Sequence, residues 1–306
     1  MQDKNIHLNI DDFFQPFDFL SSQKHKRMNT IEKAKDLQNE IIKIKASGQK
    51  VGFVPTMGAL HLGHISLVNQ AKKDVDIVVV SLFVNPNQFN NPDDLKRYPR
   101  TLEKDIELLK SASCDILFYP SVEEIYPEPD NRIFDFGYID KCMEGKFRPG
   151  HFNGVAQVVS RLFDLVPADN AYFGEKDFQQ LAIIRQMASQ YNYAIKIIGC
   201  PIIREEDGLA MSSRNLLLTP EHRKIVPIIA KSLSESRTFA KSKSVGDVTN
   251  WVITSIEKDN DLKVEYFEIC NGYTLMPISN WSDVDYIVGC IAVYAGKIRL
   301  IDNITY

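Results

Sequence analysis

Apolar residues recur along this chain with the periods of helices and of strands in turn. The first regular stretch follows Thr30 and has helical spacing, at Ile31, Ala34, Leu37, Ile41 and Ile44. Short uninterrupted apolar runs further along are typical of buried strands. These predicted strands cover residues 51–54, 76–84, 115–120, 170–174 and 194–200. Amphipathic helices are predicted between them, from about residue 64 and over 102–109, 155–166 and 178–191.

Buried strands that alternate with helices predict an α/β fold, because parallel strands need crossover connections and a sheet buried on both faces. We therefore expect a Rossmann-like, doubly wound parallel sheet over residues 30–203. After Asn215 the pattern changes: a helix is predicted with Pro220 in its first turn, and strand-like runs occupy 264–270, 286–294 and 298–301. We interpret residues 204–306 as a second, smaller α+β domain and residues 1–29 as an N-terminal extension.

Composition narrows the class of protein. The formal net charge of −4 gives no overall attraction for nucleic acid, and no run approaches the ~18 apolar residues of a membrane span. Acidic residues near the N-terminus argue against a secretory signal. The five cysteines are scattered, odd in number and without a C-x-x-C pair, so we expect reduced thiols and neither a disulfide framework nor a zinc site. A cytoplasmic protein is the prediction.

Four polar segments follow four of the predicted strands directly. In chain order they read PTMGALHLGH, NPNQF, GEKD and PIIREEDGLAMSSRN. Ligands of open parallel sheets bind beyond the carboxyl ends of the strands, so we expect these segments to share one edge of the sheet.

The first of these segments carries two imidazoles, His61 and His64, at a predicted helix start. A helix N-terminus favours phosphate, and Gly58 and Gly63 allow a ligand to approach the backbone. Imidazoles at that point can donate hydrogen bonds to phosphate oxygens. The alternatives are two surface histidines on a turn and a two-histidine zinc site, which is disfavoured because no third ligand is near.

The other segments carry groups that suit phosphates and carboxylates. Ser212, Ser213 and Arg214 offer two hydroxyls and a guanidinium, although a helix N-cap followed by a surface arginine is the simpler interpretation. Lys176 is a mobile point charge, and its neighbour Asp177 is a candidate helix cap. The amides of Gln88 and Gln180 suit a ligand with hydroxyls and a carboxylate, although most glutamines are merely solvated.

Taken together, the H-x-G-H and the Ser-Ser-Arg loop resemble the nucleotidylyl-transfer superfamily, which includes class I aminoacyl-tRNA synthetases. The order of further motifs resembles the pantothenate synthetase (pantoate–β-alanine ligase) family from about Met28 to the C-terminus. Those motifs are PTMGALHLGH, VSLFVNPNQF, RYPRT, FRPGHFNGV, YFGEKDFQQL, REEDGLAMSSRN and IRLIDN.

The resemblance implies ATP-dependent joining of pantoate to β-alanine through a pantoyl-adenylate, with Mg²⁺, release of AMP and pyrophosphate, and a homodimer. It implies catalytic roles for His61, His64, Lys176 and Arg214, with His64 as the proton donor. The ATP-binding residues it implies are Met57, Gly58, Ala59, Leu60, His61, Leu62, Gly63, His64, Gly174, Glu175, Lys176, Asp177, Ile203, Met211, Ser212, Ser213 and Arg214. Gln88 and Gln180 would bind pantoate, Gln88 would also face β-alanine, and Asn85 and Tyr98 would support that region. No metal ligand is predicted.

Three other functions remain open at this point. An adenylyltransferase would share the H-x-G-H but release no AMP. A truncated aminoacyl-tRNA synthetase would need a basic tRNA-binding surface, and the residues after Arg214 show no strong basic clustering. A non-enzymatic nucleotide-binding protein would not need His64, Lys176 and Arg214, which are all present.

Overall fold

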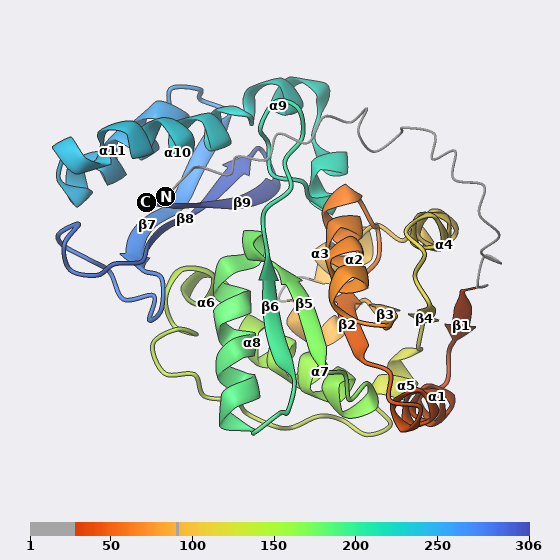
Figure 1. Ribbon diagram of the computed structural model, residues 1–306. Helices are drawn as coiled ribbons and strands as arrows, with labels where there is room; N and C mark the ends of the chain where they lie inside the picture. Colours follow the sequence, from red (N-terminus) through yellow and green to blue (C-terminus); the bar gives the residue numbers. More distant parts are fainter. Residues whose placement is uncertain (1–27, 90–91) are drawn as a thin grey trace.

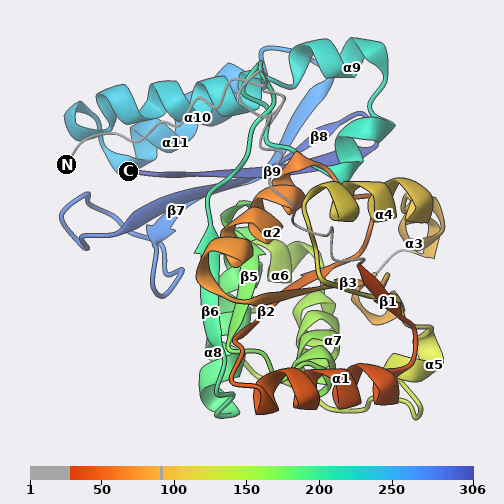
Figure 2. The same cartoon turned by 45° about the vertical axis from the view of Figure 1, so that its right-hand side comes forward.

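Two β-sheets of unequal size organise the chain (Figure 1 and Figure 2). The computed structural model describes residues 28–89 and 92–306. Within them the larger sheet is parallel, with its strands in the order β1 (Asn29–Ile31), β4 (Ile116–Phe118), β3 (Ile77–Leu82), β2 (Val51–Thr56), β5 (Asn170–Gly174) and β6 (Lys196–Cys200). The smaller sheet is antiparallel, with β7 (Leu262–Asn271), β8 (Ile287–Ala295) and β9 (Ile298–Thr305). The predicted α/β class and the second, smaller sheet are thereby confirmed.

Helices connect and cover both sheets. The α-helices are α1 (Ala34–Ala46), α2 (Leu62–Asp74), α3 (Pro92–Arg97), α4 (Leu102–Ser111), α5 (Val122–Ile125), α6 (Met143–Phe147), α7 (His151–Leu165), α8 (Phe178–Gln190), α9 (Pro220–Ile225), α10 (Ile228–Phe239) and α11 (Val245–Ile256). Short 3₁₀ turns are η2 (Pro86–Gln88), η3 (Glu175–Asp177), η4 (Ser213–Leu217) and η5 (Ala240–Ser242).

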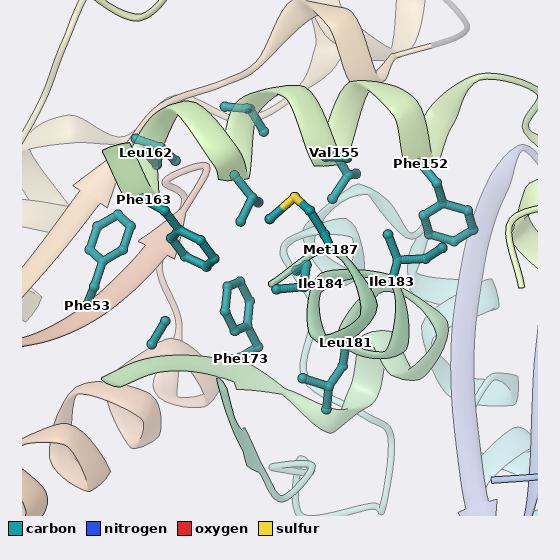
Figure 3. Close-up of a cluster of buried hydrophobic side chains, with 14 of the residues drawn as sticks. Phe53, Phe152, Val155, Leu162, Phe163, Phe173, Leu181, Ile183, Ile184 and Met187 are labelled. Carbon is teal, nitrogen blue, oxygen red and sulfur yellow. The ribbon is translucent and has the colours of Figure 1, made fainter. Parts of the chain in front are cut away.

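The parallel sheet is buried on both faces, as its continuous apolar strands predict. Side chains alternate along a strand, so Phe53 and Val54 of β2 enter different clusters. Phe53 packs with residues of α1, α7 and α8, part of which Figure 3 shows. Val54 packs with residues of α2 and α4 on the other face. This arrangement is the predicted doubly wound sheet.

The smaller sheet shares its core with the larger one. Phe267 and Ile269 of β7 pack against α10 and α11, whereas Tyr266 and Cys270 belong to the cluster of the parallel sheet. An ion pair adds a polar link, since Arg299 of β9 contacts Glu144 of α6 at 2.6 Å. The two sheets are therefore packed together, and the predicted domain boundary at residue 204 stays a prediction.

The structure departs from the predicted elements in four respects. Ile31 lies in edge strand β1 and not in the first helix, and β1 begins within the last residues assigned to the extension, of which 1–27 fall outside the described residues. The helix predicted from Pro220 is two helices, separated around Pro227, because proline lacks the N–H that a helix interior needs. The helix α11 and the short helices α3, α5 and α6 were not predicted. Strand β9 continues past residue 301 through two buried polar residues, Asp302 and Asn303.

The place where a ligand site is expected along the sheet is set by the change of strand order at β2. From β2 the sheet continues to β3 and β4 on one side and to β5 and β6 on the other. Strands β2 and β5 pair only at Gly52 with Asn170 and at Phe53 with Ala171. Their carboxyl-terminal halves are unpaired with each other, so the turns that follow them diverge at the topological switch point, where such sheets bind ligands.

Two further expectations concern the chain's environment. All five cysteines are buried, and none is joined to another by a disulfide. Across the two described ranges, no helix combines the length and the apolar character needed to cross a bilayer.

Candidate active site

The segment of residues 57–64 runs from the end of β2 into the first turn of α2 and is here called the β2–α2 turn. It is fixed by its backbone and by one buried carboxylate. Gly58 and Ala59 have positive φ values of 84° and 49°. The side chain of Asp105 on α4 accepts the backbone N–H groups of Ala59 and Leu60 at 2.9 and 2.8 Å. Asp105 is only 2% exposed and also accepts the hydroxyl of Thr101. The carboxylate of Asp105 thus stabilises a positive-φ backbone conformation that an L-residue at position 59 rarely adopts.

Both predicted histidines lie at the N-terminus of α2. His61 is the N-cap, and its Nδ1 accepts the backbone N–H of Gly63 at 3.2 Å. The Nδ1 of His64 accepts the backbone N–H of His61 at 3.3 Å. Because both Nδ1 atoms are acceptors, the neutral rings carry their protons on Nε2. Each ring therefore keeps an Nε2–H donor for another group, and the two ring centroids lie 4.1 Å apart.

The surroundings of these rings favour their neutral forms. Burial and the nearby Lys176 lower the pKa of His61 to about 4. Burial, His61 and Lys176 together hold the pKa of His64 well below its usual value. In the free protein both histidines are hydrogen-bond donors without charge near pH 7, and the positive charge comes from Lys176 and the helix N-terminus.

The segment of residues 203–217, here called the downstream segment, reaches this turn from 154 residues further along the chain. The hydroxyl of Ser213 donates to the carbonyl of Ala59 at 3.2 Å, and Cβ of Met211 lies close against Gly63. Ser212 caps η4 by accepting the N–H of Arg214. The carbonyl of Ile203 accepts the N–H of Met211 at 3.0 Å, which closes this segment on itself. The predicted convergence of the two motifs on one site is therefore present in the structure.

Tyr98 lies beside the downstream segment. Its hydroxyl has Ser213 as a hydrogen-bond partner and Arg214 nearby, while burial raises its pKa. Its ring packs edge-on against Phe89, which follows Gln88 directly. Tyr98 thus connects the downstream segment with the neighbourhood of Gln88.

Gln88 is held by a buried amide network. Asn85 is fully buried, and its Nδ2 donates to Gln88 Oε1 at 3.2 Å and to the carbonyl of Gly154 at 3.0 Å. Its Oδ1 accepts the hydroxyl of Tyr126. The Nε2 of Gln88 lies 2.9 Å from the sulfur of Met57, within the β2–α2 turn. Asn85 is thereby engaged in positioning Gln88.

The approach of η2 to α7 depends on Gly154. A Cβ at this position would lie 2.3 Å from the carbonyl oxygen of Asn87. Glycine weakens a helix interior by roughly 1 kcal/mol relative to alanine. Its presence in the first turn of α7 is explained by the backbone contact it permits.

A cavity lies next to these groups, between the start of α8, the α6–α7 region and strands β8 and β9. Its polar lining includes Lys176, Asp177, Gln180, Arg148 and His151. His151 Nδ1 lies 2.9 Å from the carbonyl of Gln88, and its Nε2 lies 3.2 Å from Arg148. Burial and Arg148 lower the pKa of His151 to about 4. The cavity thus offers cationic and amide donors beside Gln180, and His151 links it to the backbone of Gln88.

The remaining predicted residues occupy the same edge of the sheet. Gly174 ends β5, and Glu175, Lys176 and Asp177 form η3 immediately after it. Leu62 is 37% exposed at the first turn of α2. Asp177 stands at the N-cap position of α8 but makes no capping hydrogen bond with its side chain. The prediction that Asp177 caps this helix is therefore wrong; its carboxylate faces Lys176 at 3.7 Å.

Sequence reasoning assigned no role to three residues that build this site. Asp105 stands inside a helix, and nothing local in the sequence separates it from solvated acids on the same helix. Arg148 and His151 belong to FRPGHFNGV, which was noted only as a motif. Two basic residues on either side of a Pro-Gly pair were the available signal.

The donor set of the site does not favour a metal ion held by protein ligands. Among the described residues no three histidine, cysteine or acidic side chains are grouped to hold a metal ion. The described residues therefore do not fit a resident Mg²⁺ held by the protein alone.

The fold and the site are typical of α/β enzymes that bind a ligand at the switch point of a parallel sheet. Here the N-terminus of α2 and the downstream segment lie at that point. The family model for pantoate-β-alanine ligase matches residues 29–305. The chain belongs to the pantoate–β-alanine ligase family, which confirms the prediction made from its motifs.

Known pantothenate synthetases are similar to this chain in sequence and structure over nearly its whole length. Pantothenate synthetase of Bacteroides thetaiotaomicron is 54% identical over 279 residues, which are 91% of this chain and 99% of the relative. The crystal structure of pantothenate synthetase from Thermus thermophilus is similar with a TM-score of 0.85 at 42% identity, covering 90% of this chain and 99% of that one. Pantoate-β-alanine ligase from Francisella tularensis, complexed with β,γ-ATP and β-alanine, has a TM-score of 0.77 at 38% identity, covering 91% and 97%.

Proposed function

We propose that this chain condenses pantoate with β-alanine in two steps at the switch-point site, using ATP and passing through a pantoyl-adenylate. The observation that carries the proposal is the hydrogen bond from Ser213 to the carbonyl of Ala59. It joins the β2–α2 turn to the downstream segment, so that one triphosphate can contact the His61–His64 pair, Lys176 and Arg214 together.

The chemistry explains why a nucleotide is needed. A carboxylate is a poor acylating agent because an amine cannot expel oxide. A carboxylate oxygen of pantoate attacks the α-phosphorus of ATP, and the bond to pyrophosphate breaks. The amine of β-alanine then attacks the activated carbonyl carbon, loses a proton and expels AMP. One oxygen of the pantoate carboxylate leaves with AMP.

The phosphate-facing residues act mainly as preorganised electrostatics. Negative charge grows on the departing pyrophosphate, and Lys176 and Arg214 would stabilise it. The neutral rings of His61 and His64 can donate from Nε2 without first gaining a proton, since their Nδ1 atoms accept backbone N–H groups. Bound phosphate would raise the low pKa values of these rings, and that gives His64 a route to act as proton donor in the complex.

The remaining predicted residues complete the two subsites. ATP would lie along residues 57–64, Gly174–Asp177 and the backbone of Ile203, with Met211 and Ser212 closing over it. Gln88 and Gln180 would hold pantoate, with Asn85 and Tyr98 as supports. Arg148 and His151 line the same cavity as Gln180. Arg148 adds positive potential there, whereas the low pKa of His151 leaves its ring neutral near pH 7. Mg²⁺ would arrive bound to the phosphates of ATP, because Mg²⁺ usually keeps several waters and few protein ligands.

The proposal extends to the role of the C-terminal residues, the oligomeric state and the location of the protein. Residues 204–306 would serve as a lid domain that excludes water from the adenylate, a homodimer would be the working state, and the cytoplasm its location. Protease sensitivity of residues 203–217 tests the lid: ATP and pantoate should protect this segment, and unchanged cleavage would contradict closure.

Product analysis tests the reaction itself. Pantoate labelled with ¹⁸O in its carboxylate is incubated with the protein, ATP, Mg²⁺ and β-alanine, and the masses of the products are measured by mass spectrometry. Pantothenate, pyrophosphate and AMP carrying one ¹⁸O are expected. Unlabelled AMP would contradict the adenylate route. Omission of β-alanine should leave enzyme-bound pantoyl-adenylate.

The same experiment separates the other functions. An adenylyltransferase would release pyrophosphate without AMP. A synthetase fragment would bind tRNA in a gel shift, and a nucleotide-binding protein without activity would give no product from any combination of substrates.

A further inference from the structure

Strand β9 places two adjacent buried polar residues against the two loops that carry the phosphate-facing groups. Asp302 is 4% exposed and Asn303 is 6% exposed. Both lie beyond residue 301, where the apolar pattern of the strand ends. Buried polar side chains are retained where their hydrogen bonds are specific, so the partners of this pair indicate its role.

Asn303 holds the turn that carries Lys176. Its Nδ2 donates to the carbonyl of Glu175 at 2.8 Å and to the carbonyl of Lys176 at 3.1 Å. Both hydrogens of one amide are thus used on successive carbonyls of η3. Lys176 has a long side chain with many rotamers, so the position of its backbone sets where its charge can reach.

Asp302 holds the root of the downstream segment. Its two carboxylate oxygens accept a bidentate pair from Arg204 at 2.7 and 2.9 Å, and Oδ1 also accepts the backbone N–H of Asn303. Arg204 donates in addition to the carbonyl of Gly208 and pairs as a bridge with Ala210. The hairpin that delivers Met211 to Arg214 is therefore tied to Asp302, the direct neighbour of Asn303 on β9.

We propose that Asp302 and Asn303 are positioning residues that fix Lys176 and the Ser212–Arg214 loop relative to each other across the ATP phosphates. Neighbouring residues of one strand have a nearly rigid spacing, so two loops tied to them cannot shift independently. The smaller sheet thus contributes to adenylation without contacting the reacting atoms. This inference rests on the proposed function, and it concerns the first step only.

A double-mutant cycle on the adenylation rate tests the Asn303 arm in the full-length protein. Asn303→Ala should slow single-turnover pantoyl-adenylate formation by on the order of tenfold, since small misplacements of catalytic groups reduce rates strongly. Lys176→Ala should cost on the order of 10²-fold. If Asn303 acts through Lys176, the double variant should be no slower than Lys176→Ala alone. The Km for β-alanine in the second step should not change.

Controls keep the result specific. Asn271→Ala removes another asparagine of the same small sheet, which accepts the N–H groups of Tyr273 and Thr274 in a turn, and its adenylation rate should equal that of the unmodified chain. Asn303→Asp keeps the shape and removes both donors, so it replaces the alanine variant if that protein does not fold.

The role of Asp302 is tested by separate measurements, protease cleavage and the Km for ATP. Asp302→Asn removes the charged partner of Arg204, and faster protease cleavage within residues 203–217 together with a severalfold higher Km for ATP is expected. Multiplicative effects of Asn303→Ala and Lys176→Ala, or an unchanged rate in folded Asn303→Ala, would overturn the inference. Absence of pantothenate formation by the unmodified chain would instead refute the proposed function.

Discussion

The two segments that meet at the phosphates are held in different ways. The β2–α2 turn is fixed from inside: a buried carboxylate binds its backbone N–H groups, and its two histidines cap a thirteen-residue helix. The downstream segment is held by side-chain links at its ends, through Arg204 to Asp302, Arg223 to Glu205 and Ser213 to Ala59.

The contrast indicates a division of work within the site. The fixed turn presents donors that need no rearrangement when ATP binds, as electrostatic catalysis requires. The downstream segment depends on a few side-chain contacts instead. The pair of Arg204 with the buried Asp302 keeps its root in place, and the remaining contacts can rearrange on closure. Each prediction below tests one side of this comparison.

The largest effect is expected in the fixed turn at His64. His64→Ala removes a preorganised donor, and pantoyl-adenylate formation should slow by on the order of 10²-fold. Rapid-quench measurement of the adenylate checks this, with His222→Ala on α9 as a matched histidine outside the site. An unchanged rate would remove His64 from the mechanism.

The next effect concerns what keeps the turn fixed. Asp105→Ala leaves the N–H groups of Ala59 and Leu60 without their acceptor, so the free energy of unfolding should fall by about 2 to 3 kcal/mol. Urea denaturation measures the change. Glu107→Ala, an exposed acid on the same helix, should have almost no effect. Equal effects of the two variants would mean that the turn is not held by Asp105.

The neutral histidines of the turn predict a pH dependence of stability. His61 has a pKa of about 4 when folded and about 6.5 when unfolded, so the unfolded chain binds the additional proton between these values. Stability should therefore fall as pH decreases from about 6.5 towards 4, by roughly 1 to 2 kcal/mol at pH 5 from this residue. The difference between the urea midpoints at pH 7.5 and 5 should be smaller in His61→Gln than in the unmodified chain. A remainder should persist because the pKa values of His64 and His151 are lowered as well. An identical pH slope in the variant would disprove the assigned pKa.

The smallest effect should come from the contact between the two segments. Ser213→Ala removes one hydrogen bond of the free protein, so the free energy of unfolding should fall by about 1 kcal/mol, less than in Asp105→Ala. Urea denaturation measures this change, and the Km for ATP should rise because the segment is less well placed. Ser242→Ala, whose hydroxyl donates to Phe239 on the surface, is the matched control. If Ser213→Ala lowered stability as much as Asp105→Ala does, the two segments would not differ in the way described.

The sequence predicted the sheet and most of its helices because apolar periodicity reports burial, and burial decides these elements. Sequence-based prediction failed where strand pairing or buried hydrogen bonds, and not apolar burial, determine the structure. Ile31 fits a helical repeat, yet edge pairing with β4 places it in a strand. Strand β9 was predicted too short because Asp302 and Asn303 are buried for their hydrogen bonds and interrupt the apolar run.

The site was predictable to the extent that its chemistry is local. His61 and His64 are readable because a helix start and two imidazoles lie within four residues. Asp105 was not, since its partners are backbone groups more than forty residues away. Asp177 was misjudged because a residue at an N-cap position need not turn its side chain to the helix when a lysine lies beside it.

The missing side chain at Gly154 has a consequence for how this active site can change. Gln88 owes its place to a backbone contact that a single methyl group on the opposing helix would prevent. Alanine there would strengthen the helix in isolation and push the amide-bearing turn away from its ligand. Selection or design for a more stable helix at this point would therefore act against substrate recognition several residues away.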